Sequence, residues 1–175
     1  MTAARIVTVG HSNRTLREFL DLLLAFRVRR LADVRKFRKS LAFPHFNEAR
    51  LRAALKRADI AYSPIPQLGG RRLKSLNPSP RPCWRNSGFR NFADHMRTDE
   101  FLEGIRALLA EARRGRTAVM CSEAVPWRCH RSLIGDYLTV EKKRAVEELV
   151  GNRARPHRLS VCARIERGHL TYDLP

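Results

Sequence analysis

The sequence predicts a three-layer α/β fold, Rossmann-like in the loose sense only, in which helices flank a mostly parallel sheet. Short apolar segments with strand character alternate with helical segments, the pattern that parallel sheets require. The chain has 175 residues, of which 43% are hydrophobic, a globular composition. We therefore expect residues 1–175 to form one domain, which ends in a short strand pair. No G-x-G-x-x-G motif occurs, so dinucleotide binding is not predicted.

The first half of the chain predicts strand, helix, strand, helix and strand. Residues 5–10, RIVTVG, form a short apolar run typical of a buried strand. The helix that follows begins with a capping box at Thr15. Residues 28–35 predict a second strand, and Asn47 can cap the next helix. Residues 61–66 predict an edge strand, because their prolines are not tolerated in a central one.

The second half begins with a long loop. Residues 67–88 hold much of the chain's glycine, proline and serine and predict a surface loop, a type of segment that often carries function. The elements predicted after it are helices at 89–97 and 99–114, a strand at 116–121, a helix at 129–149 and two short strands around a turn at Gly168.

The charge of the chain is strongly positive. Its 35 basic and 17 acidic side chains give a net charge of +18. Such a surface attracts polyanions, so nucleic acid is one candidate partner. However, all but six of the basic residues are arginine, a bias that a GC-rich genome also produces. The charge alone therefore does not decide between these explanations.

The cysteines and the hydropathy pattern predict a cytoplasmic protein with reduced thiols. No apolar run is long enough for a membrane span, and the N-terminus does not resemble a signal peptide. The four cysteines have no spacing typical of a disulfide framework. Cys162 lies in an apolar alternation and is expected in the core, whereas Cys83 has no identifiable partner.

Polar and reactive side chains follow three of the predicted strands. Because the carboxyl ends of parallel strands meet at one edge of a sheet, these side chains are expected to face one cleft. They are His11, Ser12, Asn13 and Arg14 after the first strand, Asp33, Arg35 and Arg38 after the second, and Cys121, Glu123, Cys129, His130 and Arg131 after the fourth.

These residue types suit a small anionic ligand and thiol or acid–base chemistry. Helix N-termini and guanidinium groups bind phosphate, sulfate or carboxylate, and a thiol near positive charge is readily deprotonated. No particular cofactor is indicated. We assign catalytic roles to Cys121, Glu123, His130, His11 and Asp33, and anion binding to Ser12, Asn13, Arg14, Arg35, Arg38, Arg71, Arg72, Cys129 and Arg131.

Each assignment has a structural alternative. Cys121 could be a buried, chemically inert residue. Asp33 could anchor a neighbouring loop through backbone N–H groups, and His130 could bridge two elements. Arg71 and Arg72 could form a solvated surface pair instead of a flap that clamps a ligand.

Two familiar cysteine motifs do not fit. A cysteine-phosphatase loop has five residues between Cys and Arg, whereas six separate Cys121 from Arg128, and Pro126 removes a donor N–H. A zinc site could use Cys121, Cys129 and His130, but adjacent side chains on a helix point about 100° apart. No metal ligands are therefore assigned. A redox pair of the two cysteines lacks the usual C-x-x-C spacing.

Six segments carry a specific combination of motifs: TVGHSNRTLREFLDLL, LADVRKFRKS, FPHFNEARLRAALK, IAYSPIPQLGGRR, GFRNFADHMRTDEF and VMCSEAVPWRCHRSLIGDYL. In these segments the chain resembles the bacterial and archaeal proteins of the domain of unknown function 488 family. The resemblance covers nearly the whole chain and implies a compact three-layer α/β fold. It implies no reaction. The proline-broken segment 73–87 departs from the family pattern and could alter substrate choice.

The expected function is therefore an enzyme that acts on a small anionic substrate, phosphate- or nucleotide-like, with Cys121 as nucleophile or acid–base group. Two alternatives stay open: a nucleic-acid-binding module, and a structural or interaction protein stapled by a metal.

Overall fold

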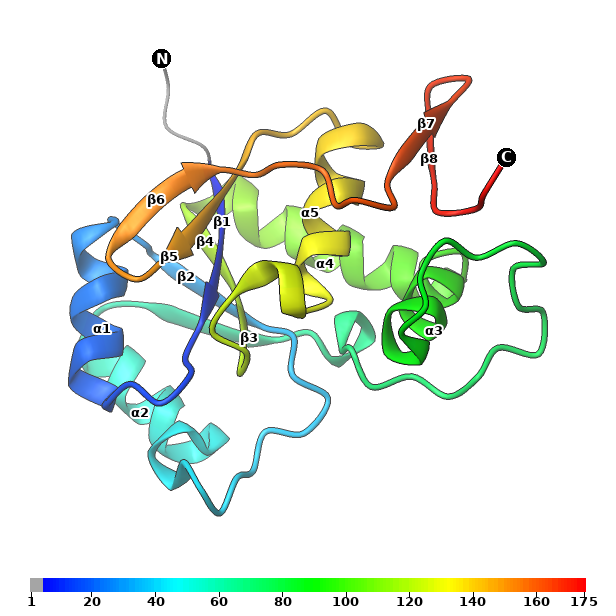
Figure 1. The fold of residues 1–175 in the computed structure, drawn as a ribbon. Helices are drawn as coiled ribbons and strands as arrows, with labels where there is room; N and C mark the ends of the chain where they lie inside the picture. Colours follow the sequence, from blue (N-terminus) through cyan, green and yellow to red (C-terminus); the bar gives the residue numbers. More distant parts are fainter. Residues whose placement is uncertain (1–4) are drawn as a thin grey trace.

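The computed structural model describes residues 5–175 and contains a six-stranded sheet between two layers of helices (Figure 1). The strand order is β3-β2-β4-β1-β5-β6, and every neighbouring pair is parallel except β5 and β6. The predicted fold class is thereby confirmed. The strands are β1 (Ile6–Gly10), β2 (Arg30–Asp33), β3 (Ala61–Pro64), β4 (Thr117–Cys121), β5 (Val146–Val150) and β6 (Arg153–Pro156).

The helices divide between the two faces of the sheet, as the two core clusters show. One cluster packs α1 (Leu16–Ala25) and α2 (Glu48–Arg57) against the sheet. The other packs α3 (Ser87–His95), α4 (Asp99–Arg114) and α5 (Arg131–Val140) against the opposite face. Three short 3₁₀ helices lie between these elements: η1 (Pro44–Phe46), η2 (Pro66–Leu68) and η3 (Pro126–Arg128).

The central strands explain why the thiol at the end of β4 faces the α4 and α5 side. Every residue of β1 and β4 is buried, as expected for parallel strands covered on both faces. Side chains alternate between the faces, so Met120 joins the cluster of α1 and α2 while Val119 and Cys121 join the other. β3 is an edge strand, as its prolines predict.

The predicted start of α1 is confirmed, and the cap of α2 is not. Thr15 and Glu18 form the expected capping box, with Glu18 N donating to Thr15 Oγ1 over 3.2 Å. Asn47 holds the N-cap position of α2, but its side chain makes no cap hydrogen bond. Its Oδ1 instead accepts from the backbone N–H of Ser40 at 2.7 Å, which ties the loop after β2 to α2.

The single helix predicted over 129–149 is wrong. α5 ends at Val140, and β5 begins at Val146. Between them Lys143 adopts a left-handed backbone with φ 51°, which breaks the helix. The segment AVEEL has helical local character, but pairing with β1 buries Val146 and Leu149, so tertiary contacts override local preference.

The C-terminal strand pair is confirmed. β7 (Arg164–Glu166) and β8 (His169–Thr171) form a two-stranded antiparallel sheet. The two residues between them, Arg167 and Gly168, both have positive φ, 50° and 87°, as a type I′ hairpin turn requires.

The expectation of reduced thiols is wrong for two of the four cysteines. Cys83, in the predicted loop 67–88, forms a disulfide with Cys162, 79 residues further along the chain. The contact was invisible in the sequence because it depends on how the C-terminal segment packs: Cys83 N donates to Tyr172 O at 3.0 Å. Cys121 and Cys129 remain free thiols.

No helix within residues 5–175 combines the length and apolar character that crossing a lipid bilayer requires.

Candidate active site at the carboxyl edge of the sheet

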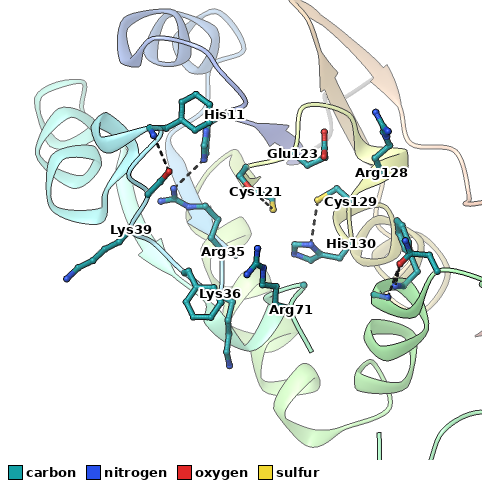
Figure 2. Close-up of a pocket in the computed structure, with 18 residues that line it drawn as sticks. His11, Arg35, Lys36, Lys39, Arg71, Cys121, Glu123, Arg128, Cys129 and His130 are labelled. Atoms are coloured by element: carbon teal, nitrogen blue, oxygen red, sulfur yellow. Dashed lines mark hydrogen bonds between the residues drawn. The ribbon is translucent and has the colours of Figure 1, made fainter. Parts of the chain in front are cut away.

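A pocket of about 610 Å³ lies at the carboxyl ends of β1, β2 and β4 (Figure 2). Several segments that are distant in the sequence contribute to its wall, which is the convergence that parallel topology predicts. The residues lining it are His11, Arg35, Lys36, Phe37, Lys39, Ser40, Phe43, Gly70, Arg71, Asn86, Gly88, Phe89, Cys121, Ser122, Glu123, Arg128, Cys129 and His130.

Half of the residues chosen from the sequence line this pocket, and half do not. Those on its wall are His11, Arg35, Arg71, Cys121, Glu123, Cys129 and His130. Those that lie elsewhere are Ser12, Asn13, Arg14, Asp33, Arg38, Arg72 and Arg131.

Three arginines outside the pocket wall are engaged in local structure. Arg14 donates from Nη1 to Gly10 O at 2.7 Å. Arg38 forms an ion pair with Glu48 at 2.7 Å. Arg72 pairs with Glu100 at 2.8 Å and also donates to backbone carbonyls of the preceding turn. These contacts satisfy the guanidinium groups, so we do not carry these three arginines forward as ligand-binding residues.

Asp33 positions Arg35 instead of facing the pocket. It is fully buried, and its carboxylate accepts from Arg35 Nε at 2.9 Å and Nη2 at 2.7 Å. Tyr62 donates its hydroxyl to the same carboxylate at 2.8 Å. This two-point contact fixes the guanidinium plane of Arg35, so one face of the pocket carries a rigidly held positive charge.

His11 lies beside Arg35 and is neutral near pH 7. Burial, with a further contribution from the Arg35 charge, lowers the pKa of His11 to about 4. Its Nδ1 lies 2.9 Å from Ser12 O and therefore carries the ring proton, which it donates to that carbonyl. Nε2 is then an acceptor, 3.4 Å from Arg35 Nη1. The ring also stacks on Phe46, with centroids 4.1 Å apart.

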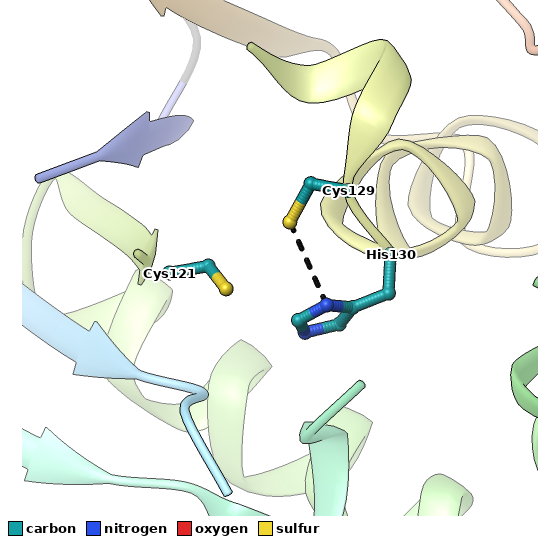
Figure 3. Close-up of side chains that lie close together, drawn as sticks. All are labelled: Cys121, Cys129 and His130. Carbon is teal, nitrogen blue, oxygen red and sulfur yellow. Dashed lines mark hydrogen bonds between the residues drawn. The ribbon is translucent and has the colours of Figure 1, made fainter. Parts of the chain in front are cut away.

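The two free thiols and an imidazole form the reactive centre of the pocket. Figure 3 shows Cys121 at the end of β4 and Cys129 and His130 just before α5, with their side chains directed toward one another. Their potential ligand atoms all lie within 4.8 Å of each other. Cys129 Sγ is 3.5 Å from His130 Nδ1.

The two sulfurs are not equivalent. Hydrogen bonding to Cys129, together with burial, raises the pKa of Cys121 to about 12. For Cys129, burial opposes ionisation, but the hydrogen bond from Cys121 and the charge of Arg131 outweigh it and lower the pKa to about 6. These contacts therefore favour ionisation of Cys129, which was assigned a binding role from its sequence position, over ionisation of Cys121, the expected nucleophile.

Arg131 lies behind the Cys129 sulfur and not on the pocket wall. It is 1% exposed and donates from Nε to Cys129 Sγ at 3.4 Å. Its Nη2 donates to Glu123 O, which links the start of α5 to the loop after β4. Within residues 5–175 its Nη1 is buried without a hydrogen-bond partner. A fixed positive charge thus supports the sulfur from the protein side.

Two glycines permit the close packing around this centre. A Cβ on Gly10 would lie 1.8 Å from Glu123 O, and one on Gly70 would lie 2.2 Å from His130 Nδ1. Only glycine fits at either position without displacing its neighbour. The Leu-Gly-Gly-Arg-Arg motif therefore packs directly on the Cys-His-Arg motif.

Sequence reasoning missed the rest of the pocket wall. Lys36 and Lys39 follow Arg35 in the same loop, and their proximity to it was the available signal. Arg128 was weighed only as part of a phosphatase loop. Phe37 is 65% exposed, with the Arg71 guanidinium 5.6 Å from its ring centroid. Such an aromatic residue has no signal in sequence that separates it from core.

The fold and the site together define a class: an α/β protein whose parallel sheet carries a cysteine–histidine pair within a basic pocket at its carboxyl edge. The family model described as "Domain of unknown function DUF488" matches residues 15–138, and the chain belongs to this family. The matched range contains every pocket residue except His11. No curated protein and no solved structure matches the chain.

Proposed function

We propose that the protein is an enzyme that acts on a small anionic substrate, with Cys129 as the nucleophile. The observation that carries this proposal is the composition of one pocket wall. A sulfur in contact with a guanidinium and an imidazole opens on the same cavity as five basic side chains. Those five are Arg35, Lys36, Lys39, Arg71 and Arg128.

The basic side chains would bind the charged group of the substrate and align its electrophilic atom with the sulfur. They come from three separate segments, so they can surround an anion from different sides. Asp33 supports this role indirectly, because it fixes the orientation of Arg35. The pocket contains a single carboxylate, Glu123, so its net charge favours an anion.

The proposed chemistry is a two-step displacement. Cys129 Sγ attacks the electrophilic atom, and a sulfur–substrate bond forms as the bond to the leaving group breaks. The leaving group departs with the bonding electron pair and takes a proton from His130. Water, deprotonated by Glu123, then cleaves the sulfur–substrate bond, and the sulfur leaves with the bonding electron pair as the thiolate. The proton then passes from Glu123 through solvent to His130, which restores the starting state. Arg131, which donates to the Cys129 sulfur, would hold that sulfur in position.

Charge-selective alkylation tests this proposal without a known substrate. Metal-free protein is treated near pH 7 with iodoacetate, an anion, or iodoacetamide, which is neutral, and labelled sites are identified by mass spectrometry. We expect Cys129 to be labelled, with iodoacetate favoured about 10-fold relative to free cysteine, because a basic pocket concentrates anions. Inorganic phosphate should slow the iodoacetate reaction selectively.

Matched variants separate the roles. Cys121→Ser should retain labelling at Cys129, and Cys129→Ser should lose the fast reaction. Arg71→Ala should lower the iodoacetate rate and leave the iodoacetamide rate unchanged, whereas Arg17→Ala, an exposed arginine on α1, should alter neither. Preferential labelling of Cys121, or equal relative rates for the two reagents, would overturn the proposal.

A second candidate, single-stranded nucleic acid as the ligand, is supported by one further observation. The exposed ring of Phe37 lies on the pocket wall among Lys36, Lys39 and Arg71, an arrangement suited to base stacking beside phosphates. Binding of a labelled oligonucleotide should fall steeply as salt rises and weaken in Phe37→Ala. Binding that is absent, or insensitive to salt, removes this candidate.

A further inference from the structure

The side chains of Cys121, Cys129 and His130 have the donor set of a thiophilic metal site. Two sulfurs and one imidazole nitrogen lie within 4.8 Å of one another. In a tetrahedral zinc site, Zn–S bonds of about 2.3 Å and Zn–N bonds of about 2.0 Å give a sulfur–nitrogen separation of about 3.5 Å. The observed distance from Cys129 Sγ to His130 Nδ1 is 3.5 Å. Cys129 Sγ and His130 Nδ1 are therefore already separated by the distance that tetrahedral zinc coordination requires.

From the sequence, Cys129 and His130 were expected to lie within one helix, where adjacent side chains point about 100° apart. In fact α5 begins only at Arg131, and Cys129 has an extended backbone with φ −137° and ψ 144°. The change of backbone conformation between Cys129 and His130 turns both side chains toward Cys121, as Figure 3 shows.

We infer that Cys121, Cys129 and His130 bind a thiophilic divalent cation, Zn²⁺ above all, with the fourth coordination position open to the pocket. Two sulfurs and an imidazole favour Zn²⁺ over hard cations such as Mg²⁺ or Ca²⁺, which prefer oxygen ligands. The open position faces the basic wall of the pocket, so its natural occupant is hydroxide or a small anion.

The site is expected to bind the cation reversibly and not to hold a permanent structural metal. Structural zinc sites have four protein ligands, and this one offers three. Ligating histidines normally donate their second ring nitrogen to an outer partner, but in the described part of the chain His130 Nε2 is buried without one. Arg131 also draws electron density from the Cys129 sulfur through its hydrogen bond. Each feature weakens the affinity.

Metal binding and nucleophilic attack exclude each other at Cys129. A sulfur that donates its electron pair to Zn²⁺ is not free to attack a substrate, and binding displaces the thiol protons. The cation therefore inhibits the proposed enzyme instead of serving as its cofactor. The inference goes beyond the proposed function and does not depend on it, because the ligand geometry stands whatever reaction the pocket performs.

Cobalt titration tests the site directly. Co²⁺ is added under nitrogen to protein freed of metal by a chelator. One equivalent should produce sulfur-to-cobalt charge-transfer absorption in the near ultraviolet and the intense visible bands of tetrahedral Co²⁺. Zn²⁺ should then displace the cobalt. Cys121→Ser, Cys129→Ser and His130→Gln should each weaken binding about 100-fold or more, since even outer-shell changes cost 10–100-fold.

Two controls keep the test independent of folding. His169→Gln removes an exposed histidine far from the cluster in sequence and should bind cobalt as the unchanged protein does. In the unchanged protein, Zn²⁺ should protect Cys121 and Cys129 from iodoacetamide. A weak octahedral cobalt spectrum, or charge-transfer bands that survive in both serine variants, would overturn the inference. The alkylation test of the proposed enzyme uses metal-free protein, so its result does not depend on whether the cation binds.

Discussion

Two histidines next to α5, His130 at its N-cap and His157 beside Asp136, have opposite surroundings. His157 donates from both ring nitrogens to acidic groups: its acceptors, Asp136 Oδ1 and Glu148 Oε1, each lie at 2.9 Å. His130 has one weak sulfur contact, and its Nε2 is buried without a partner among the residues described. A buried polar group normally finds partners within the protein. His157 is therefore held by the fold, whereas His130 has few polar contacts among the residues described.

The His157 cluster fastens the C-terminal segment to the rest of the chain. Asp136, fully buried on α5, accepts from Ser160 N at 2.9 Å and from the Tyr172 hydroxyl at 2.9 Å, as well as from His157. All three partners follow residue 138, where the match to the family ends. The cluster thus joins α5, at the end of the matched range, to the C-terminal segment that follows it.

The largest expected loss of stability comes from Asp136→Ala. It would leave His157, Ser160 and Tyr172 without their shared acceptor in a buried place. We expect the free energy of unfolding in urea to fall by about 3–5 kcal/mol, the usual cost of breaking a buried charged pair. Asp21→Ala, at an exposed ion pair of α1, should change it by less than about 0.5 kcal/mol. Similar losses for the two variants would contradict a structural role for the cluster.

Removal of the disulfide is expected to cause the next largest loss of stability. It closes a loop across 79 residues of sequence, which constrains the unfolded chain by about 4 kcal/mol. Cys83→Ala combined with Cys162→Ala should lower the free energy of unfolding by that order. Iodoacetamide labelling of Cys129 should stay unchanged, because the disulfide is not part of the pocket wall. Altered labelling would mean that the C-terminal segment shapes the site and does not merely support it.

The pH dependence of stability isolates His157. Burial alone would lower its pKa, but the hydrogen bonds and charges of Asp136 and Glu148 outweigh it and raise the pKa to about 9 from 6.5. Because the folded pKa is raised, the stabilisation is complete below about pH 6.5 and is lost as the pH rises through 9. It amounts to about 3 kcal/mol.

Urea unfolding measures this stabilisation. The unchanged protein and His157→Gln are compared near pH 6 and near pH 9.5. The difference in unfolding free energy between the two proteins should shrink by about 3 kcal/mol at the higher pH. A difference that is constant across the range would mean that the imidazole is not held in its charged form.

The comparison also explains what the sequence could predict. Buried strands such as β1 and the capping box at Thr15 have local signals, and topology alone directed Arg35, Cys121 and His130 to one edge. What depended on long-range packing was missed. The pairing of Cys83 with Cys162 and the formation of β5 each required knowing where a distant segment lies.

Roles within the site depend on contacts that the sequence does not show. From the sequence, Asp33 and Cys121 were assigned catalytic roles and Cys129 a binding role. Only three-dimensional contacts show that the Asp33 carboxylate is paired with Arg35 and that Arg131 donates a hydrogen bond to the Cys129 sulfur. Which of two neighbouring thiols loses its proton is decided by donors that no spacing rule reveals.

The smallest expected effect, His130→Gln, completes the comparison between the two histidines. His130 loses one sulfur contact and its packing at 5.0 Å between ring centroids with Phe92, so the free energy of unfolding should fall by only about 1 kcal/mol. The same substitution at His157 should cost several times more near pH 6. Cobalt binding should reverse this order, disappearing in His130→Gln and persisting in His157→Gln. If His130→Gln destabilised the protein as strongly as His157→Gln, its imidazole would be part of the fold, and the roles proposed for His130 as proton donor and metal ligand would lose their support.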